Sequence, residues 1–70
     1  MTKRRDIIRA IRDAASRQGL AVAVTEGGNH TLVVLDGLKI PVPRHNEVRE
    51  LTARSIYKQA AEKLGEDWWK

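Results

Sequence analysis

Two histidines and one arginine are the residues of this chain best suited to chemistry. His30 follows a glycine-rich segment that ends in Gly28 and Asn29, and His45 follows Arg44. Cleavage of RNA without a metal needs one group that takes the proton from the 2′-hydroxyl and one that protonates the departing 5′-oxygen. An imidazole titrates near neutral pH and can serve in either role. Because glycine lets a phosphate approach the backbone closely, the position of His30, beside Gly28 and Asn29, is suited to such chemistry.

Arg44 and His45 form the second candidate group. The dipeptide Asp36-Gly37 predicts a tight hairpin between the strand that begins at His30 and the strand that leads to Arg44. A two-residue turn sets His30 opposite Pro43, so that Arg44 and His45 lie nearby. Arg44 is expected to hold a phosphate and His45 to act as the complementary acid or base. Two other interpretations stay open, in which His45 caps a helix and His30 is an ordinary surface residue.

The basic residues are unevenly distributed along the chain. Residues 1–17 contain six Lys and Arg against two Asp, whereas the remaining seven Lys and Arg balance seven Asp and Glu, so the net charge of +4 lies entirely in the first segment. Such asymmetry favours an acidic partner such as RNA. The residues expected to contact RNA are Lys3, Arg5, Arg9, Arg12, Arg54 and Lys58. A solvated helix face has the same composition, and this alternative stays open.

Aromatic residues are scarce, since the chain has no Phe, one Tyr and two Trp. An aromatic platform for base stacking across a sheet is therefore not expected, and recognition by shape and backbone is favoured. Trp68 and Trp69, in a short tail at residues 66–70, are expected to dock on apolar surface. Stacking on a base or binding a partner is the alternative.

Several other kinds of site have no basis in the sequence. The chain has no cysteine, which excludes disulfides and thiolate metal sites, and two histidines without cysteine argue against zinc, so no metal and no cofactor is expected. A Walker motif is absent, and Gly27-Gly28 is too short for a dinucleotide-binding loop. No apolar run approaches the roughly 18 residues of a membrane span. We therefore expect a cytoplasmic protein without a membrane partner.

Two amphipathic helices are predicted, one at each end of the chain. The first covers residues 2–18, with Thr2 as its N-cap and Gly19 at its end. The second begins between residues 48 and 52 and stops before Gly65. Their apolar stripes consist of Ile7, Ile8, Ile11, Ala14 and Ala15 in the first helix and Ala53, Ile56, Ala60 and Leu64 in the second.

Three strands are predicted between the helices, at residues 20–25, 30–35 and 38–42. The middle strand is expected to be central because both of its faces are mostly apolar. Pro41 and Pro43 make the third an edge strand. The sequence thus predicts an α+β domain at residues 1–65 with the order α-β-β-β-α, in which both helices cover one face of a three-stranded antiparallel sheet.

The faces of the strands follow from alternation. The outer strands are expected to turn their large side chains to the core, namely Leu20, Val22, Val24, Leu38, Ile40 and Val42. In the middle strand we assign Leu32 and Val34 to the core, and His30 shares their parity. The open face then carries Thr31, Val33 and Leu35. An apolar open face suits a protein partner or a dimer.

In their order and spacing, three segments of this chain and its basic first helix resemble the corresponding parts of HicA-type toxins of bacterial toxin–antitoxin pairs. The matching segments, besides the basic first helix, are Gly28-Asn29-His30, Val42-Pro43-Arg44-His45 and Thr52 through Ala60. The resemblance implies a double-stranded-RNA-binding-domain-like fold and a metal-independent endoribonuclease, an mRNA interferase that inhibits translation. It also implies a HicB-like antitoxin that covers the active site in a hetero-oligomer. The family's catalytic histidine, in a Gly-Ser-His motif, falls on His30, with Asn29 in place of the serine.

Two other function classes stay open beside the toxin. A non-catalytic RNA-binding module would keep salt-dependent affinity for RNA without cleaving it. A protein-interaction module that uses the open sheet face would show no salt-dependent affinity for RNA.

Overall fold

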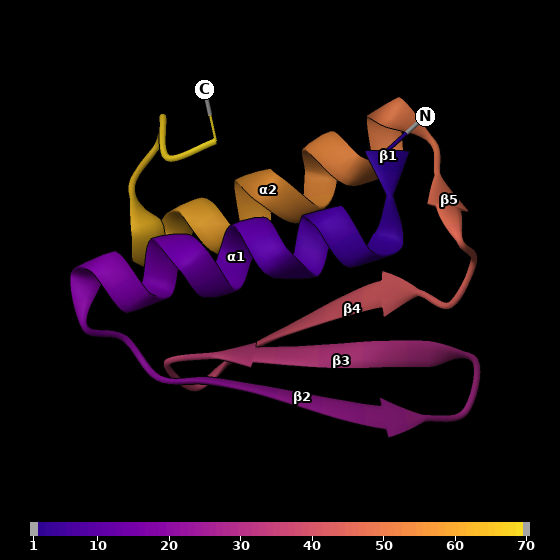
Figure 1. Cartoon of the computed structure of the whole chain (residues 1–70), viewed down its shortest axis with the longest axis horizontal. Coiled ribbons are helices and arrows are strands. Elements are labelled where there is room, and N and C mark those ends of the chain that lie inside the picture. Colours follow the sequence, from indigo (N-terminus) through magenta and orange to yellow (C-terminus); the bar gives the residue numbers. More distant parts are fainter. Residues whose placement is uncertain (1, 70) are drawn as a thin grey trace.

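Two helices lie side by side on one face of a three-stranded antiparallel sheet (Figure 1). The computed structural model describes residues 2–69. Its elements in chain order are β1 (Thr2–Lys3), α1 (Arg4–Gln18), β2 (Val22–Gly27), β3 (His30–Leu35), β4 (Leu38–Pro43), β5 (Glu47–Val48) and α2 (Glu50–Leu64). The main sheet has the order β2-β3-β4, so β3 is central and β4 is an edge strand, as predicted. No helix among the described residues is long and apolar enough to cross a membrane.

Tight turns set the register of the sheet. Asp36 and Gly37 have φ angles of 49° and 86°, the positive values that a two-residue type I′ turn requires. As predicted, this turn sets His30 opposite Pro43. Gly28-Asn29 forms the other turn, with Gly28 at a φ of 51°. Because that turn is so short, β2 continues to Gly27, two residues further than predicted.

The predicted face assignment of β3 is wrong. Its core-facing residues are Thr31, Val33 and Leu35, which are fully buried, whereas His30, Leu32 and Val34 lie on the open face. Directly opposed residues of an antiparallel pair share a face. Val33 is opposite both Val24 and Ile40, whose side chains point to the core. Pairing with the two neighbouring strands therefore decides the face of β3, and His30 does not share the core-side parity.

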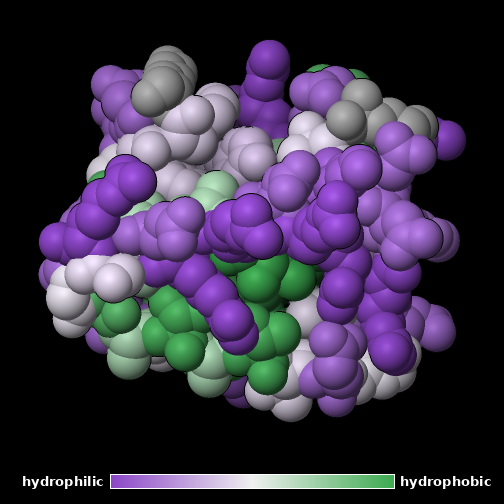
Figure 2. Space-filling model, viewed as in Figure 1, coloured by the Kyte–Doolittle hydropathy of each residue, from purple (hydrophilic) through white to green (hydrophobic). Residues whose placement is uncertain are grey.

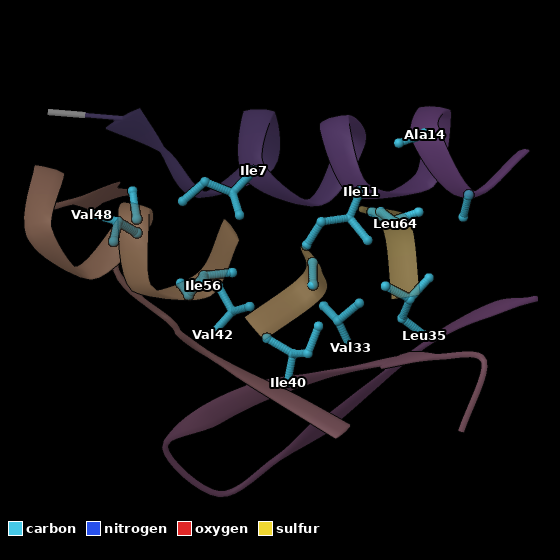
Figure 3. Packing of buried hydrophobic residues seen from close by; sticks show 13 residues of the cluster. Ile7, Ile11, Ala14, Val33, Leu35, Ile40, Val42, Val48, Ile56 and Leu64 are labelled. Atoms are coloured by element: carbon cyan, nitrogen blue, oxygen red, sulfur yellow. The ribbon is translucent and has the colours of Figure 1, made fainter. Parts of the chain in front are cut away.

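The core fills the space between the helices and the sheet (Figure 3). Ile7 and Ile11 of α1 point toward the sheet, where Val33 and Ile40 lie below Ile11. Ile56 of α2 lies beside Val42 of β4. At the outer edge of the sheet the core is less covered, and Figure 2 shows apolar side chains in the space between α1 and β2. The half-buried apolar residues of these two elements and their connection are Ile8, Leu20, Val22 and Val24.

A short second sheet, which was not predicted, joins the starts of the two helices. β1 pairs antiparallel with β5, and the backbone N–H of Arg4 donates to the carbonyl of Asn46 at 2.9 Å. The prediction that Thr2 caps a helix is wrong, because Thr2 lies in β1 and its hydroxyl donates to the Glu50 carboxylate at 3.3 Å. α2 begins at Glu50, within the predicted range of residues 48 to 52.

The C-terminal segment packs against α2 through its tryptophans. The Trp68 Nε1–H donates to the carbonyl of Tyr57 at 2.9 Å. The Tyr57 ring meets the Trp68 ring edge-on at 5.4 Å between centroids and stacks with the Trp69 ring at 5.6 Å. Burial, followed by the charges of Asp6 and Glu50, raises the pKa of Tyr57. Trp68 thus packs against the core, as predicted, whereas Trp69 lies on the ring of Tyr57.

Two adjacent valines provide a test of the face assignment. Val33→Ala is expected to lower the free energy of unfolding by about 2 kcal/mol, because it removes two carbon atoms from a fully buried position. Val34→Ala, on the open face, is expected to cost less than about 1 kcal/mol. Both substitutions change strand propensity equally, so their difference in urea denaturation reports burial. A larger loss at Val34 would contradict the assignment.

Candidate nucleic-acid interface

The end of the sheet where β3 begins and β4 ends carries the predicted catalytic group. His30 is opposite Gly27 on one side and Pro43 on the other, so the turn before β3 and the loop after β4 flank it. A shallow depression at this place is lined by Gly28, Asn29, His30, Pro43, Arg44 and His45. The structure therefore brings together all the residues for which a catalytic or supporting role was predicted.

Both histidines are exposed on this depression. His45 does not lie at a helix start, because the N-cap residue of α2 is Arg49. The interpretation of His45 as a helix cap is therefore wrong. Among the described residues neither imidazole has a hydrogen-bond partner, so both ring nitrogens of His30 and of His45 are open to a ligand.

Arg44 is held in place by two contacts on the adjoining hairpin. Its Nη1–H donates to the carbonyl of Gly28 at 3.0 Å, and its Nε lies 3.4 Å from Oε1 of Glu26. A guanidinium has five N–H donors in a planar fork. The donors that these two contacts leave over, including those on Nη2, can bind a phosphate at the depression.

The carboxylate of Glu26 is the centre of a polar cluster that the sequence pattern did not indicate. The hydroxyl of Thr31 donates to Oε1 at 2.9 Å, and Nη2 of Arg4 lies 3.0 Å from Oε2. Arg4 Nη2 also donates to the Thr31 hydroxyl. Together with Arg44, three residues from three different segments surround one carboxylate. We call Arg4, Glu26, Thr31 and Arg44 the Glu26 cluster.

Charge and hydrogen bonding keep Glu26 ionised. The hydrogen bond from Thr31 lowers the pKa of Glu26; desolvation opposes this, and the charges of Arg4 and Arg44 lower it further. The signal of this cluster in the sequence is the alternation of side chains along β2, in which Glu26 has the same parity as Val22 and Val24. A carboxylate that continues a core-facing row requires partners at the end of the core.

The cationic residues of the first helix adjoin this cluster. One surface pocket is lined by Lys3, Arg4, Arg5, Asn46 and Glu47, and the next along α1 by Arg4, Arg5, Ile8, Arg9, Arg12 and Asp13. Both pockets include Arg4 and Arg5, and Arg4 is linked to Arg44 through Glu26. A basic surface composed of Lys3, Arg4, Arg5, Arg9, Arg12 and Arg44 therefore leads from the depression along α1.

Arg54 and Lys58 do not belong to this surface. They lie on α2 and line a separate pocket with Trp69, which shares no residue with the depression at His30. Residues 2–69 contain no group of three or more His, Cys, Asp or Glu side chains that could hold a metal ion. The arrangement offers acid–base groups and cations at one place, which suits a phosphodiester.

Acid titration tests the Glu26 cluster. Because the pKa of Glu26 is below its ordinary value of 4.5 in the folded protein, its carboxylate stabilises the fold at neutral pH. This contribution disappears as the pH falls through the folded-state pKa. We expect the difference in free energy of unfolding between wild type and Glu26→Gln to be constant above about pH 6 and to shrink toward about pH 3. A difference that does not change with pH in urea denaturation would contradict the cluster.

Comparison with family models, with curated proteins and with solved structures found no match to this chain. The resemblance to HicA-type toxins accordingly stays a prediction.

Proposed function

We propose that this chain is an endoribonuclease that cleaves RNA in the depression at His30. The observation that supports this most strongly is the pairing of β3 with β4, which places Arg44 and His45 beside His30. Two imidazoles and one guanidinium at one place can supply the base, the acid and the charge stabilisation that metal-independent cleavage of RNA requires. The basic surface along α1 supplies charges for the backbone of the substrate.

The chemistry assigns one role to each group. One of the imidazoles, His30 or His45, takes the proton from the 2′-hydroxyl, and the 2′-oxygen attacks the adjacent phosphorus. The bond from phosphorus to the 5′-oxygen breaks, and the other imidazole protonates the departing oxygen. The remaining N–H donors of Arg44 stabilise the negative charge that develops on the phosphate oxygens. The products are a 2′,3′-cyclic phosphate and a free 5′-hydroxyl.

The biological setting of the proposal is a type II toxin–antitoxin pair. The substrate is then messenger RNA, and the partner is a HicB-like antitoxin that covers the depression. The proposal follows from the resemblance of the segments around His30, Arg44 and α2, together with the basic surface. The half-exposed apolar residues Leu32 and Val34 lie on the same sheet face as His30 and suit contact with a partner protein.

One observation favours a second candidate, a non-catalytic RNA-binding module of the same fold. A catalytic histidine is commonly oriented by a hydrogen bond to its second ring nitrogen. Among the described residues neither His30 nor His45 has such a bond. The binding module retains the basic surface and lacks only the cleavage step, so activity measurements separate the two.

The exposure of His30 makes it suitable for a catalytic test. Removal of a general acid or base typically costs 100-fold or more, so we expect His30→Ala to lower RNA cleavage by at least about 100-fold. In a bacterial host, induction of the wild type is expected to arrest growth and fragment messenger RNA, whereas the variant does neither.

Circular dichroism and thermal melting serve as the control for this experiment, because an exposed side chain is not expected to affect folding. Full activity of a folded His30→Ala protein would refute the catalytic role. Inactivity of both folded proteins would favour the binding module.

If RNA binds along the basic surface, the cations of α1 determine how strongly salt weakens the affinity for RNA. Each phosphate contact contributes about 0.7 to the slope of log affinity against log salt for single-stranded nucleic acid. The double variant Arg5→Gln/Arg9→Gln is therefore expected to reduce the slope by about 1.4. The control Arg54→Gln/Lys58→Gln removes the same charge from the separate pocket on α2 and should change the slope less. Equal changes in RNA titrations would show that RNA also crosses α2.

A further inference from the structure

Glu26 is an acid beside a site that, as proposed, binds a phosphate. A negative charge at this place repels the phosphates of RNA. Burial does not explain the carboxylate either, because half of the Glu26 side-chain surface is exposed. Its own neighbours account for it: Thr31, Arg4 and Arg44 all contact the carboxylate. With these donors around it, Glu26 stays ionised and has no proton to transfer. Its chemistry fits a structural partner for a cation and not an acid or a base.

The contacts of Arg44 show what that partner does. Glu26 binds Nε and the carbonyl of Gly28 binds Nη1, so two separate points of the planar guanidinium are attached to the β2–β3 hairpin. Within the described part of the chain, the hydrogen bond of the Arg44 side chain is made by Nη1, not by Nη2. Attachment at two points restricts rotation of the planar guanidinium and leaves donors on Nη1 and Nη2 for a further ligand.

The cluster is itself anchored to the core. Thr31 is fully buried, opposite Glu26 on β2 and opposite Val42 on β4. Arg4 is the first residue of α1, and its backbone N–H is bound to the carbonyl of Asn46. Glu26 therefore connects an exposed guanidinium to rigid parts of the fold, and ordering a side chain before binding removes part of the entropic cost of binding.

We propose that Glu26 is a positioning residue that orients the Arg44 guanidinium for a phosphodiester in the depression, with Thr31 and Arg4 holding Glu26 in place. This inference rests on the proposed function insofar as the phosphate belongs to RNA. Glu26 itself touches no substrate and acts through Arg44.

Glu26→Gln provides a test because the two interpretations of Glu26 predict effects of opposite sign. If Glu26 were only a nearby negative charge, its neutralisation would raise affinity for an anion. As a positioning residue, its loss is expected to weaken binding by about three- to tenfold, the range expected when one long side chain has to be ordered on binding. The probes are inorganic phosphate, followed by NMR of the Arg44 Nε–H, and a short single-stranded RNA. Glu62→Gln on α2 is the charge-matched control, and its affinity should be unchanged or slightly higher.

A double-mutant cycle with Arg44→Gln identifies the route of the effect. If Glu26 acts through Arg44, Glu26→Gln has no further effect on affinity in the Arg44→Gln background, although it still lowers stability by releasing Arg4. An equal loss of affinity in both backgrounds would overturn the inference. Should Glu26→Gln fold poorly, Thr31→Val retains the charge of Glu26 but removes the bond that holds it, and is expected to weaken phosphate binding in the same direction.

Cleavage assays on the same proteins separate this inference from the proposed function. A wild type that binds phosphate through Arg44, depends on Glu26 for it and does not cleave RNA would refute the proposed catalysis and support the positioning role. A wild type that cleaves RNA, beside a Glu26→Gln variant that binds phosphate as tightly or more tightly, would support the catalysis and refute the positioning role.

Discussion

Antiparallel pairing of β3 with both neighbouring strands is the constraint on which the rest of the molecule depends. Opposed residues share a face, so the row through Val24, Val33 and Ile40 belongs to the core as a unit. The same pairing sets His30 opposite Pro43 and thereby places the loop after β4 beside the turn before β3. One set of backbone hydrogen bonds thus determines both the packing of the core and the composition of the depression.

In the next core-facing row, toward the depression, the polar residues Glu26 and Thr31 are opposed to each other. Thr31 is fully buried, and a buried hydroxyl destabilises the fold unless it is hydrogen-bonded. Glu26 accepts its hydrogen bond, and Arg4 reaches both residues from the start of α1. Pairing of β1 with β5 holds this helix start in place. The polar end of the core is therefore also the point at which α1, the sheet and Arg44 are joined.

The imidazoles of His30 and His45 and the guanidinium of Arg44 lie on the surface, beside a turn and a loop that the sheet holds rigidly. The Gly28-Asn29 turn and the Arg44-His45 loop carry side chains with little burial, which leaves them accessible to a large ligand. The cations along α1 extend this site in one direction, whereas those of α2 face a different pocket. A basic surface that runs from this depression along one helix suits contact with phosphates better than contact with bases.

The sequence by itself determined the order of the two helices and the three strands between them, the Asp36-Gly37 turn, and hence the pairing of His30 with Pro43. These features depend on local chemistry: positive φ at a turn and periodicity along a segment. The sequence did not determine the face of β3, since both faces of that strand are mostly apolar, and Thr31, as the polar member, was assigned to the open face. Burial of Thr31 is favourable only because Glu26 and Arg4 hydrogen-bond to it. Likewise, β1 and β5 are two residues long and show no periodicity. Tertiary structure alone decided these features, because the groups that stabilise them come from distant parts of the chain.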